Sequence, residues 1–303
     1  MNCIYEDILM DMTENKELHA LLRLIDDPDE EVFASVSERI CSYGISVIPN
    51  LENLWENTLS PPVQQRIESL IHQLHFGKLE KDFYAWADSE VNDLLSGTIL
   101  SIRLHYPDFQ PADLINAIEK IRRNIWLELN NYLTPLEQAN ILTSIIYNYY
   151  NIAGKAVNHE SIDDFFIHKV VEKRQGNGVS IGILYQVLCN LLDINACLVQ
   201  IPRHLIVAFY HSNFASQNAS SDIAKHIHFL VDATTGQWYS VQEIESYLKR
   251  MNMPAEDAFY LPMSNKQIIG ILLEEMAKCY HRADEKIKYN SIMRLVNYLN
   301  YGK

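Results

Sequence analysis

Apolar side chains recur at three- and four-residue spacing through the first quarter of the chain, which is the period of an amphipathic helix. One such face precedes the acidic turn at residues 26–31. A second runs from Val32 to Tyr43, and Gly44 is expected to end that helix. A third helix is predicted after the break at 59–62, with Pro61 in its first turn.

The same helical spacing continues to about residue 170. The apolar positions from Phe83 to Leu94 predict one helix, and those from Leu114 to Leu129 predict another. Thr134-Pro135-Leu136-Glu137 has the pattern of a capping box with proline at the first helical position, so a third helix is expected to begin there. A fourth is expected to begin at Ser161.

The pattern then changes to short runs rich in β-branched residues. Residues 196–201, 205–210 and 227–232 are predicted to be strands, with a polar loop at about 211–225. A helix is expected at 241–248, and two more between about 264 and 300. Helices followed by an antiparallel sheet indicate an α+β fold that is mostly helical.

Composition narrows the possible partners and the compartment. The chain of 303 residues carries a net charge of −14, which disfavours nucleic acid and anionic membranes as partners. The first residues carry acids where a signal peptide needs bases, and we expect a cytoplasmic protein without a membrane span. The five cysteines are scattered, which indicates reduced thiols and neither a disulfide framework nor a zinc site.

Three residues of the central stretch have the order of a nucleophile–histidine–aspartate site. Ser180 is expected at the start of an apolar helix, after Gly176 and Gly178, where free N–H groups surround its side chain. His204 begins a predicted strand, and Asp232 ends the next one. If the two residues lie side by side, Asp232 would hold one nitrogen of the His204 ring while the other nitrogen faces the helix start.

Four segments carry a family resemblance: VVEKRQGNGVSIGILY at 170–185, LLDINA at 191–196, IPRHLIV at 201–207 and VDATTG at 231–236. Together they resemble the SirB-type transglutaminase-like proteins, a branch of the papain-like transglutaminase superfamily, over about residues 90 to 300. The resemblance implies a papain-like fold in which a helix packs on a small antiparallel sheet. It also implies a nucleophile at the helix start, His204 as base and Asp232 as the orienting residue. We expect no cofactor.

The flanks of this core are expected to be helical repeats. The first helices resemble a HEAT-type repeat, and the region from Ile268 to Tyr280 resembles the first helix of a TPR-like tail. The expected organisation is therefore a HEAT-like segment at 1–78, a transglutaminase-like core at 79–260 and TPR-like helices at 261–303.

The sequence departs from the family pattern at two places. The helix start reads Gly178-Val179-Ser180 without a cysteine, as is common in the SirB-type branch, and any of the three residues can occupy the nucleophile position. Arg203 stands where the family usually has glycine. Cys189 lies nine residues further along the same helix, about 13 Å away on the opposite face, so it is no substitute. We expect Gly178, Val179, Arg203 and Trp238 to line the cleft.

Three functions remain open. The first is a non-catalytic module that binds a protein or peptide, which the missing cysteine favours. The second is a hydrolase or acyl transferase that acts on peptide or amide bonds with Ser180, His204 and Asp232. The third is a metal-dependent enzyme that uses His226 and His228, which are expected to face the same side of one strand.

Overall fold

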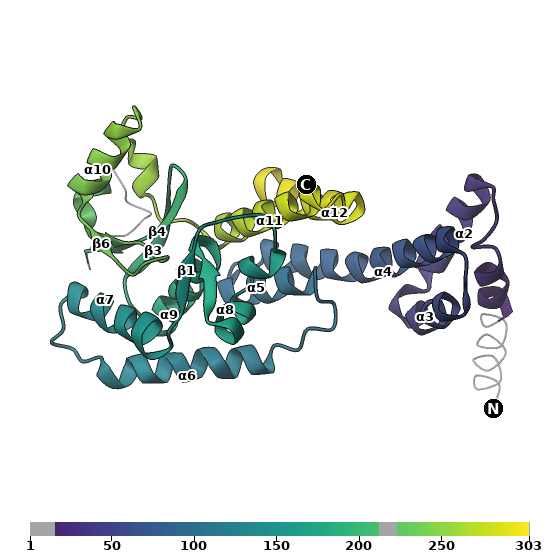
Figure 1. Cartoon of the computed structure of the whole chain (residues 1–303), viewed down its shortest axis with the longest axis horizontal. Coiled ribbons are helices and arrows are strands. Elements are labelled where there is room, and N and C mark those ends of the chain that lie inside the picture. Colours follow the sequence, from purple (N-terminus) through teal and green to yellow (C-terminus); the bar gives the residue numbers. More distant parts are fainter. Residues whose placement is uncertain (1–15, 212–222, 303) are drawn as a thin grey trace. The chain divides into compact units, whose positions relative to one another are not determined.

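The computed structural model describes residues 16–211 and 223–302, and the chain divides into two compact units, Met1–Asp82 and Phe83–Lys303. Helices build the first unit: one at 16–23, then α2 (Glu30–Ser42), a 3₁₀ turn (Gly44–Val47), α3 (Ile48–Asn57) and the start of α4 (Pro61–Asp88) (Figure 1). Their apolar faces meet in one cluster formed by Ile25, Val36, Ile40, Val47, Ile48, Leu51, Ile67, Leu70 and Leu74.

The acidic turn of the first unit is held by a side-chain cap and a cation. The Asp29 carboxylate accepts a hydrogen bond from the Glu31 N–H at 2.8 Å, which makes Asp29 the N-cap of α2. The Arg66 guanidinium, from α4, donates to the carbonyls of Ile25 and Asp27 at 2.9 and 2.6 Å. As predicted, α2 ends before Gly44, whose φ of +70° suits glycine.

The single helix predicted from Phe83 to Leu94 is wrong. α4 ends at Asp88, and α5 (Leu94–Arg103) begins only after a break in which Val91 is 81% exposed. The Asp93 carboxylate caps α5 by accepting from the Ser96 N–H at 2.7 Å. The Trp86 indole N–H donates to the Asp93 carbonyl at 2.8 Å and closes the turn. Apolar spacing alone does not reveal such a break, because residues on both sides of it are buried.

Three further helical segments lead to the core of the second unit. They are α6 (Ala112–Glu128), α7 (Pro135–Thr143) with a π-helical end at Ser144–Tyr149, and α8 (Ile167–Lys173) after a 3₁₀ turn at Ile162–Phe165. The capping box predicted at Thr134 is confirmed, because its hydroxyl accepts from the Glu137 N–H and the Glu137 carboxylate accepts from the Thr134 N–H.

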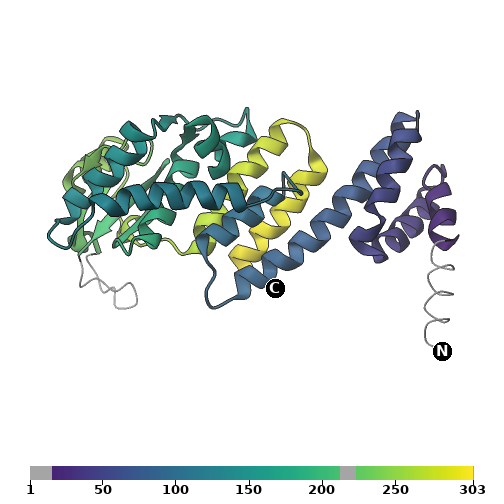
Figure 2. The ribbon, with the colours of Figure 1, turned by 90° about the horizontal axis from the view of Figure 1, so that it is seen from below.

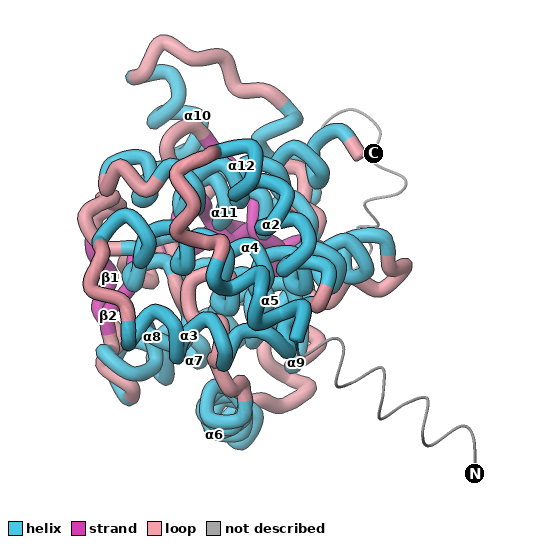
Figure 3. The backbone as a smooth tube through the Cα atoms, turned by 90° about the vertical axis from the view of Figure 1, so that its right-hand side faces the viewer, coloured by secondary structure: helices cyan, strands magenta, loops and turns pink. Residues whose placement is uncertain are grey.

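A buried helix, α9 (Gly178–Leu191), runs through the centre of the second unit, and Val179 to Cys189 are all buried. Just before α9, the short strand β2 (Gln175–Asn177) contains Gly176. This strand pairs in parallel with β1 (Ala153–Lys155), and the two lie side by side at one edge of the tube drawing (Figure 3).

The three predicted strands are confirmed as β3 (Ala196–Ile201), β4 (His204–Tyr210) and β5 (Ile227–Val231), and a short β6 (Trp238–Tyr239) extends the antiparallel sheet in the order β3-β4-β5-β6. α9 covers one face and α10 (Val241–Arg250) covers the other (Figure 1). Most of the predicted polar loop between β4 and β5 lies outside the described residues.

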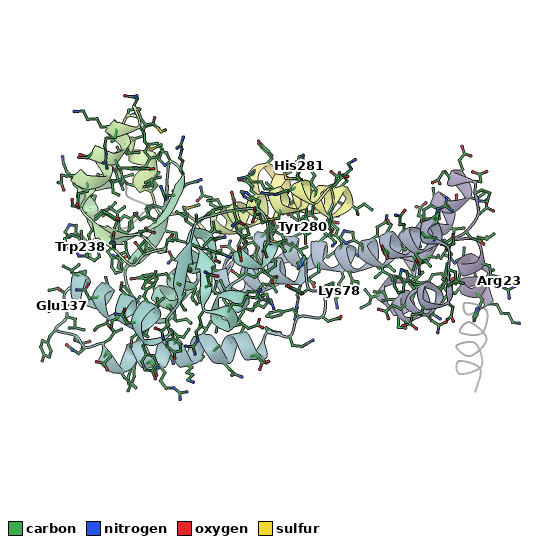
Figure 4. All side chains as sticks on the ribbon, viewed as in Figure 1. Arg23, Lys78, Glu137, Trp238, Tyr280 and His281 are labelled. Atoms are coloured by element: carbon green, nitrogen blue, oxygen red, sulfur yellow. The ribbon has the colours of Figure 1, made fainter. Side chains whose placement is uncertain are left out.

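Two antiparallel helices close the second unit, α11 (Asn265–Arg282) and α12 (Lys286–Tyr301), drawn in yellow (Figure 2). Tyr280 of α11 is labelled in Figure 4, and a 2.6 Å hydrogen bond joins its hydroxyl to Nδ1 of the His105 ring. The predicted mostly helical α+β fold is confirmed. None of the described helices has the length and apolar character needed to span a bilayer.

Candidate functional site

Ser180 is the third residue of α9, and its hydroxyl is fully committed to the fold. The residue is 0% exposed. Its Oγ donates to the Asp164 carbonyl at 2.7 Å and accepts from the Asn177 N–H at 3.1 Å. Among the residues that the structure describes, no hydrogen bond joins Ser180 to His204. The serine therefore acts as part of a helix cap.

The N–H groups at the start of α9 are also occupied. Asn177 is the N-cap, and its Oδ1 accepts from the Val179 and Ser180 N–H groups, both at 3.0 Å. These are the groups that would stabilise an oxyanion in a catalytic site. Because the Asn177 side chain binds both, two of the donors expected at this helix start are not available to a substrate.

Gly178 is the first residue of α9 and has no side chain to offer. A Cβ built there would lie 3.1 Å from the Thr234 hydroxyl, so this position faces the turn after β5. Gly154 packs still closer, with its Cβ position 1.9 Å from the Thr234 carbonyl oxygen. The turn therefore fills the space beside the start of α9, where Gly178 is half-buried.

His204 lies on the sheet face that α9 does not cover. On β4, Leu205 faces α9, because its side chain lies 3.5 Å from the Cβ position of Gly182. Ile206 faces the other way and packs in the cluster that contains Ile244 of α10. Since alternate residues of a strand point to opposite faces, His204 shares the face of Ile206. Its ring packs against α10 accordingly, edge to face with Tyr247 at 5.7 Å between centroids.

Asp232 follows β5 and organises its own turn. Its Oδ1 accepts from the Thr234 N–H at 2.7 Å, and its Oδ2 accepts from the Thr235 hydroxyl at 3.0 Å. In the described part of the chain, no hydrogen bond joins Asp232 to the His204 ring. The structure therefore brings His204 and Asp232 to one cavity but does not connect them, and it places Ser180 elsewhere.

The cavity that His204 and Asp232 share, called here the main cavity, lies between the sheet and α10 and has a volume of about 770 Å³. Half of its lining residues are apolar or aromatic, and the other half are polar or charged. The lining residues are Ile201, His204, Leu205, Ile206, Asp232, Tyr239, Glu243, Ile244, Ser246, Tyr247, Lys249 and Arg250. This volume and lining are those of a binding pocket for an organic ligand or a peptide segment.

None of the four residues expected to line the cleft lines the main cavity. Val179 is buried, and Gly178 faces the Thr234 turn. Trp238, labelled in Figure 4, pairs with Val231 on the α9 side of the sheet and is 51% exposed. Arg203 lines a second cavity of about 570 Å³, described below. Strand alternation separates Trp238 from its neighbour Tyr239, which does line the main cavity.

The two histidines considered for a metal do not share a strand face. His226 belongs to a 3₁₀ turn (Ile223–His226) before β5, so the alternation expected of a strand does not apply to it. His228 lies at an irregularity in the β4–β5 pairing, and its ring packs on His211 at 3.6 Å between centroids. Within residues 16–211 and 223–302, no three His, Cys, Asp or Glu side chains are placed to hold a metal ion.

The cysteines of the core are unsuited to nucleophilic chemistry. Cys189 is 0% exposed on α9, and burial raises the pKa of its thiol far above the ordinary value. Burial also raises the pKa of Cys197 on β3. The thiolate is the reactive form, so both thiols are held in the unreactive state. Cys3 lies outside the described residues.

Comparison with known proteins gives the family. The profile of the transglutaminase-like superfamily matches residues 112–274. The chain belongs to the transglutaminase-like superfamily. It is 23% identical to protein SirB1 of Salmonella typhimurium and 24% identical to protein YchA of Escherichia coli K12, each over 195 residues that cover 63% of this chain and 68% of the relative. These relatives agree with the SirB-type resemblance of the core. No solved structure matches.

Within this transglutaminase-like fold, sequence reasoning missed the contribution of α10. Tyr239, Glu243 and Tyr247 line the main cavity, but nothing in their local pattern distinguishes them from an ordinary strand end and amphipathic helix. Tyr147 also lies beside this turn, and its hydroxyl donates to the Ala233 carbonyl next to Asp232. The π-helical end of α7 carries Tyr147, and π-helical turns are frequent near functional sites, but they have no simple sequence signal.

Proposed function

We propose that this chain is a non-catalytic member of the transglutaminase-like superfamily whose main cavity binds a segment of a partner polypeptide. The observation that carries the proposal is the separation of Ser180 from His204. The serine caps α9 with both hydrogen-bonding capacities in use, while His204 lies on the opposite face of the sheet against Tyr247. A hydrolase needs the nucleophile and base within hydrogen-bond reach.

The shape of the cavity supports a polypeptide as the occupant. Its volume of about 770 Å³ exceeds what one side chain fills, and its apolar walls suit aliphatic or aromatic groups. The hydroxyls of Tyr239 and Tyr247 and the His204 ring supply polar contacts for a backbone that enters with those side chains. Aromatic residues of this kind are common in peptide-binding surfaces.

The absence of catalysis is tested with a fluorophosphonate probe, which labels activated serines. We expect no labelling of the full chain at Ser180 across neutral and mildly alkaline pH, and no hydrolysis of fluorogenic peptides. Labelling that is lost in both Ser180→Ala and His204→Ala would establish the hydrolase and refute the proposal.

Binding is tested by selecting peptides from a random phage-displayed library on the full chain and measuring synthetic versions by fluorescence anisotropy. Tyr247→Ala removes an aromatic wall and is expected to weaken binding about tenfold or more. Tyr132→Ala is the matched control, because Tyr132 is 96% exposed and lines neither cavity. Equal affinity of the Tyr247→Ala variant and the unmodified chain would contradict binding in the main cavity.

A further inference from the structure

The loop between β3 and β4 holds an arginine in a conformation that favours glycine. Ile201 pairs with His204, so Pro202 and Arg203 form a two-residue hairpin loop. Arg203 has a φ of +69°, and proline followed by a residue with positive φ is the signature of a type II turn. Arginine in this region is less stable than glycine, since its Cβ crowds the backbone.

Arg203 is one of two arginines with positive φ in the described ranges. In the described ranges, most of the other non-glycine residues with positive φ are of the Asn/Asp type, which tolerates that region: Asn151, Asp193, Asn252 and Asp284. The remaining one, Arg174, ends α8. A long cationic side chain in the hairpin therefore points to a use of the side chain itself.

The hairpin separates two adjoining cavities. Arg203 lines a cavity of about 570 Å³, called here the hairpin cavity, between the hairpin and α11. His204, the next residue, lines the main cavity. Ile201 lines both, so the two cavities share a lining residue at the base of the hairpin. A ligand that extends beyond the main cavity on this side passes over Arg203.

Three cations border this path, beside the acids Asp232, Glu243 and Glu274. Arg203, Lys249 and Arg250 are exposed, and none of them forms an ion pair within the described residues. The acids of the main cavity are already engaged. Asp232 accepts two hydrogen bonds from its own turn, and Glu243 accepts two from the N-cap residue of α10. The cations are therefore available to an incoming carboxylate, while hydrogen bonds within the fold already use part of the accepting capacity of the two acids.

We infer that the polypeptide segment bound in the main cavity continues over the hairpin and carries an acidic side chain that pairs with Arg203; this rests on the proposed function. A guanidinium presents parallel donors that match a carboxylate in two-point contact. Lys249 and Arg250, at the end of α10, add attraction at the rim and speed the encounter. The bound segment therefore combines apolar residues for the main cavity with Asp or Glu nearby.

The test uses the peptides selected from the random library on the full chain. We expect them to combine apolar residues with an acidic residue within about three positions, since an extended chain advances about 3.3 Å per residue. Replacing that acid by its amide is expected to weaken binding about two- to fivefold, and added salt is expected to reduce the difference.

The decisive variant is Arg203→Gly. It is expected to weaken binding of the acidic peptide about two- to fivefold and to leave binding of its amide counterpart unchanged. Glycine suits the turn, so the variant is expected to melt about 2–4 °C higher, and a loss of binding cannot be attributed to unfolding. Glu274→Gln removes the acid that lines the hairpin cavity and is expected to strengthen binding of the acidic peptide.

The outcomes separate the inference from the proposed function. If selected peptides bind, depend on Tyr247 and show no preference for an acid, the proposed function stands and the role of Arg203 is refuted. If Arg203→Gly weakens acidic and amide peptides equally, the pairing is refuted as well. If no peptide is selected, or if all bind independently of Tyr247, the proposed function fails and the inference fails with it.

Discussion

Replacing Ser180 by alanine distinguishes a helix cap from a nucleophile by its effect on stability. In the cap, the Ser180 hydroxyl is the acceptor for the Asn177 N–H at 3.1 Å and the donor to the Asp164 carbonyl at 2.7 Å. Asn177 is 0% exposed, so water does not replace the lost acceptor. A nucleophilic serine that is dispensable for the fold would leave stability nearly unchanged.

The size of the effect follows from the two groups left behind. A buried N–H without an acceptor costs about 1–3 kcal/mol, and loss of a helix cap costs about 0.5–2 kcal/mol. These contributions overlap, because the same hydroxyl provides both. We therefore expect Ser180→Ala to lower the free energy of unfolding by about 2–3 kcal/mol, a large part of the 5–15 kcal/mol typical of a domain.

Urea unfolding followed by tryptophan fluorescence measures this loss of stability in the second unit, which contains Ser180. Trp86, Trp126 and Trp238 lie in the second unit, and only Trp55 lies in the first. With a slope of about 3 kcal/mol per M, the midpoint is expected to fall by roughly 1 M. Ser246→Ala is the control. The exposed Ser246 hydroxyl donates to the Gln242 carbonyl, so its removal is expected to change stability by about 0.5 kcal/mol or less. Equal midpoints for Ser180→Ala and Ser246→Ala would refute the cap.

Three further predictions follow from burial and close packing. Burial lowers the pKa of His168 to about 4, so the unfolded chain binds a proton at this residue before the folded chain does. The free energy of unfolding therefore decreases as pH falls from about 6.5 to about 4, by roughly 1–2 kcal/mol after allowance for solvent screening. The urea midpoint of His168→Phe is expected to depend less on pH than that of the unmodified chain. Gly154→Ala is expected to cost about 2–3 kcal/mol, because its Cβ position lies 1.9 Å from the Thr234 carbonyl oxygen; a midpoint equal to that of the unmodified chain would contradict this packing. Gly178→Cys is expected to react faster with iodoacetamide than an ordinary thiol, because the helix start lowers its pKa, and to show no peptide hydrolysis, because His204 lies on the other face of the sheet. Hydrolysis by that variant would refute the assignment of faces.

Local patterns predicted most of the elements because their causes are local. The capping box at Thr134 needs only the residues within one turn, and the strands at 196–201 and 227–231 follow from runs of β-branched residues between breaks. The break between Asp88 and Leu94 escaped prediction because it depends on the Trp86 side chain, which reaches over to the Asp93 carbonyl. A contact of that kind leaves no mark in the spacing of apolar residues.

The candidate site was predictable in its residues but not in its geometry. Order and spacing pointed to Ser180, His204 and Asp232, and the structure places two of them on the main cavity. The sequence did not decide which residue at the start of α9 would face the sheet. That choice depends on Asn177, which caps the helix and turns Ser180 inward to the Asp164 carbonyl.

The sequence by itself determined most of the elements, the family and the absence of a cysteine at the helix start. It also determined that His204 and Ile206 share one face of a strand, because that alternation is a property of the extended backbone. Only the tertiary structure decided which helix covers that face. Since α10 packs there and α9 packs on the other side, His204 meets Tyr247 instead of Ser180. Packing between distant segments, which no local pattern encodes, brings His204 and Tyr247 to the main cavity and leaves Ser180 outside its lining.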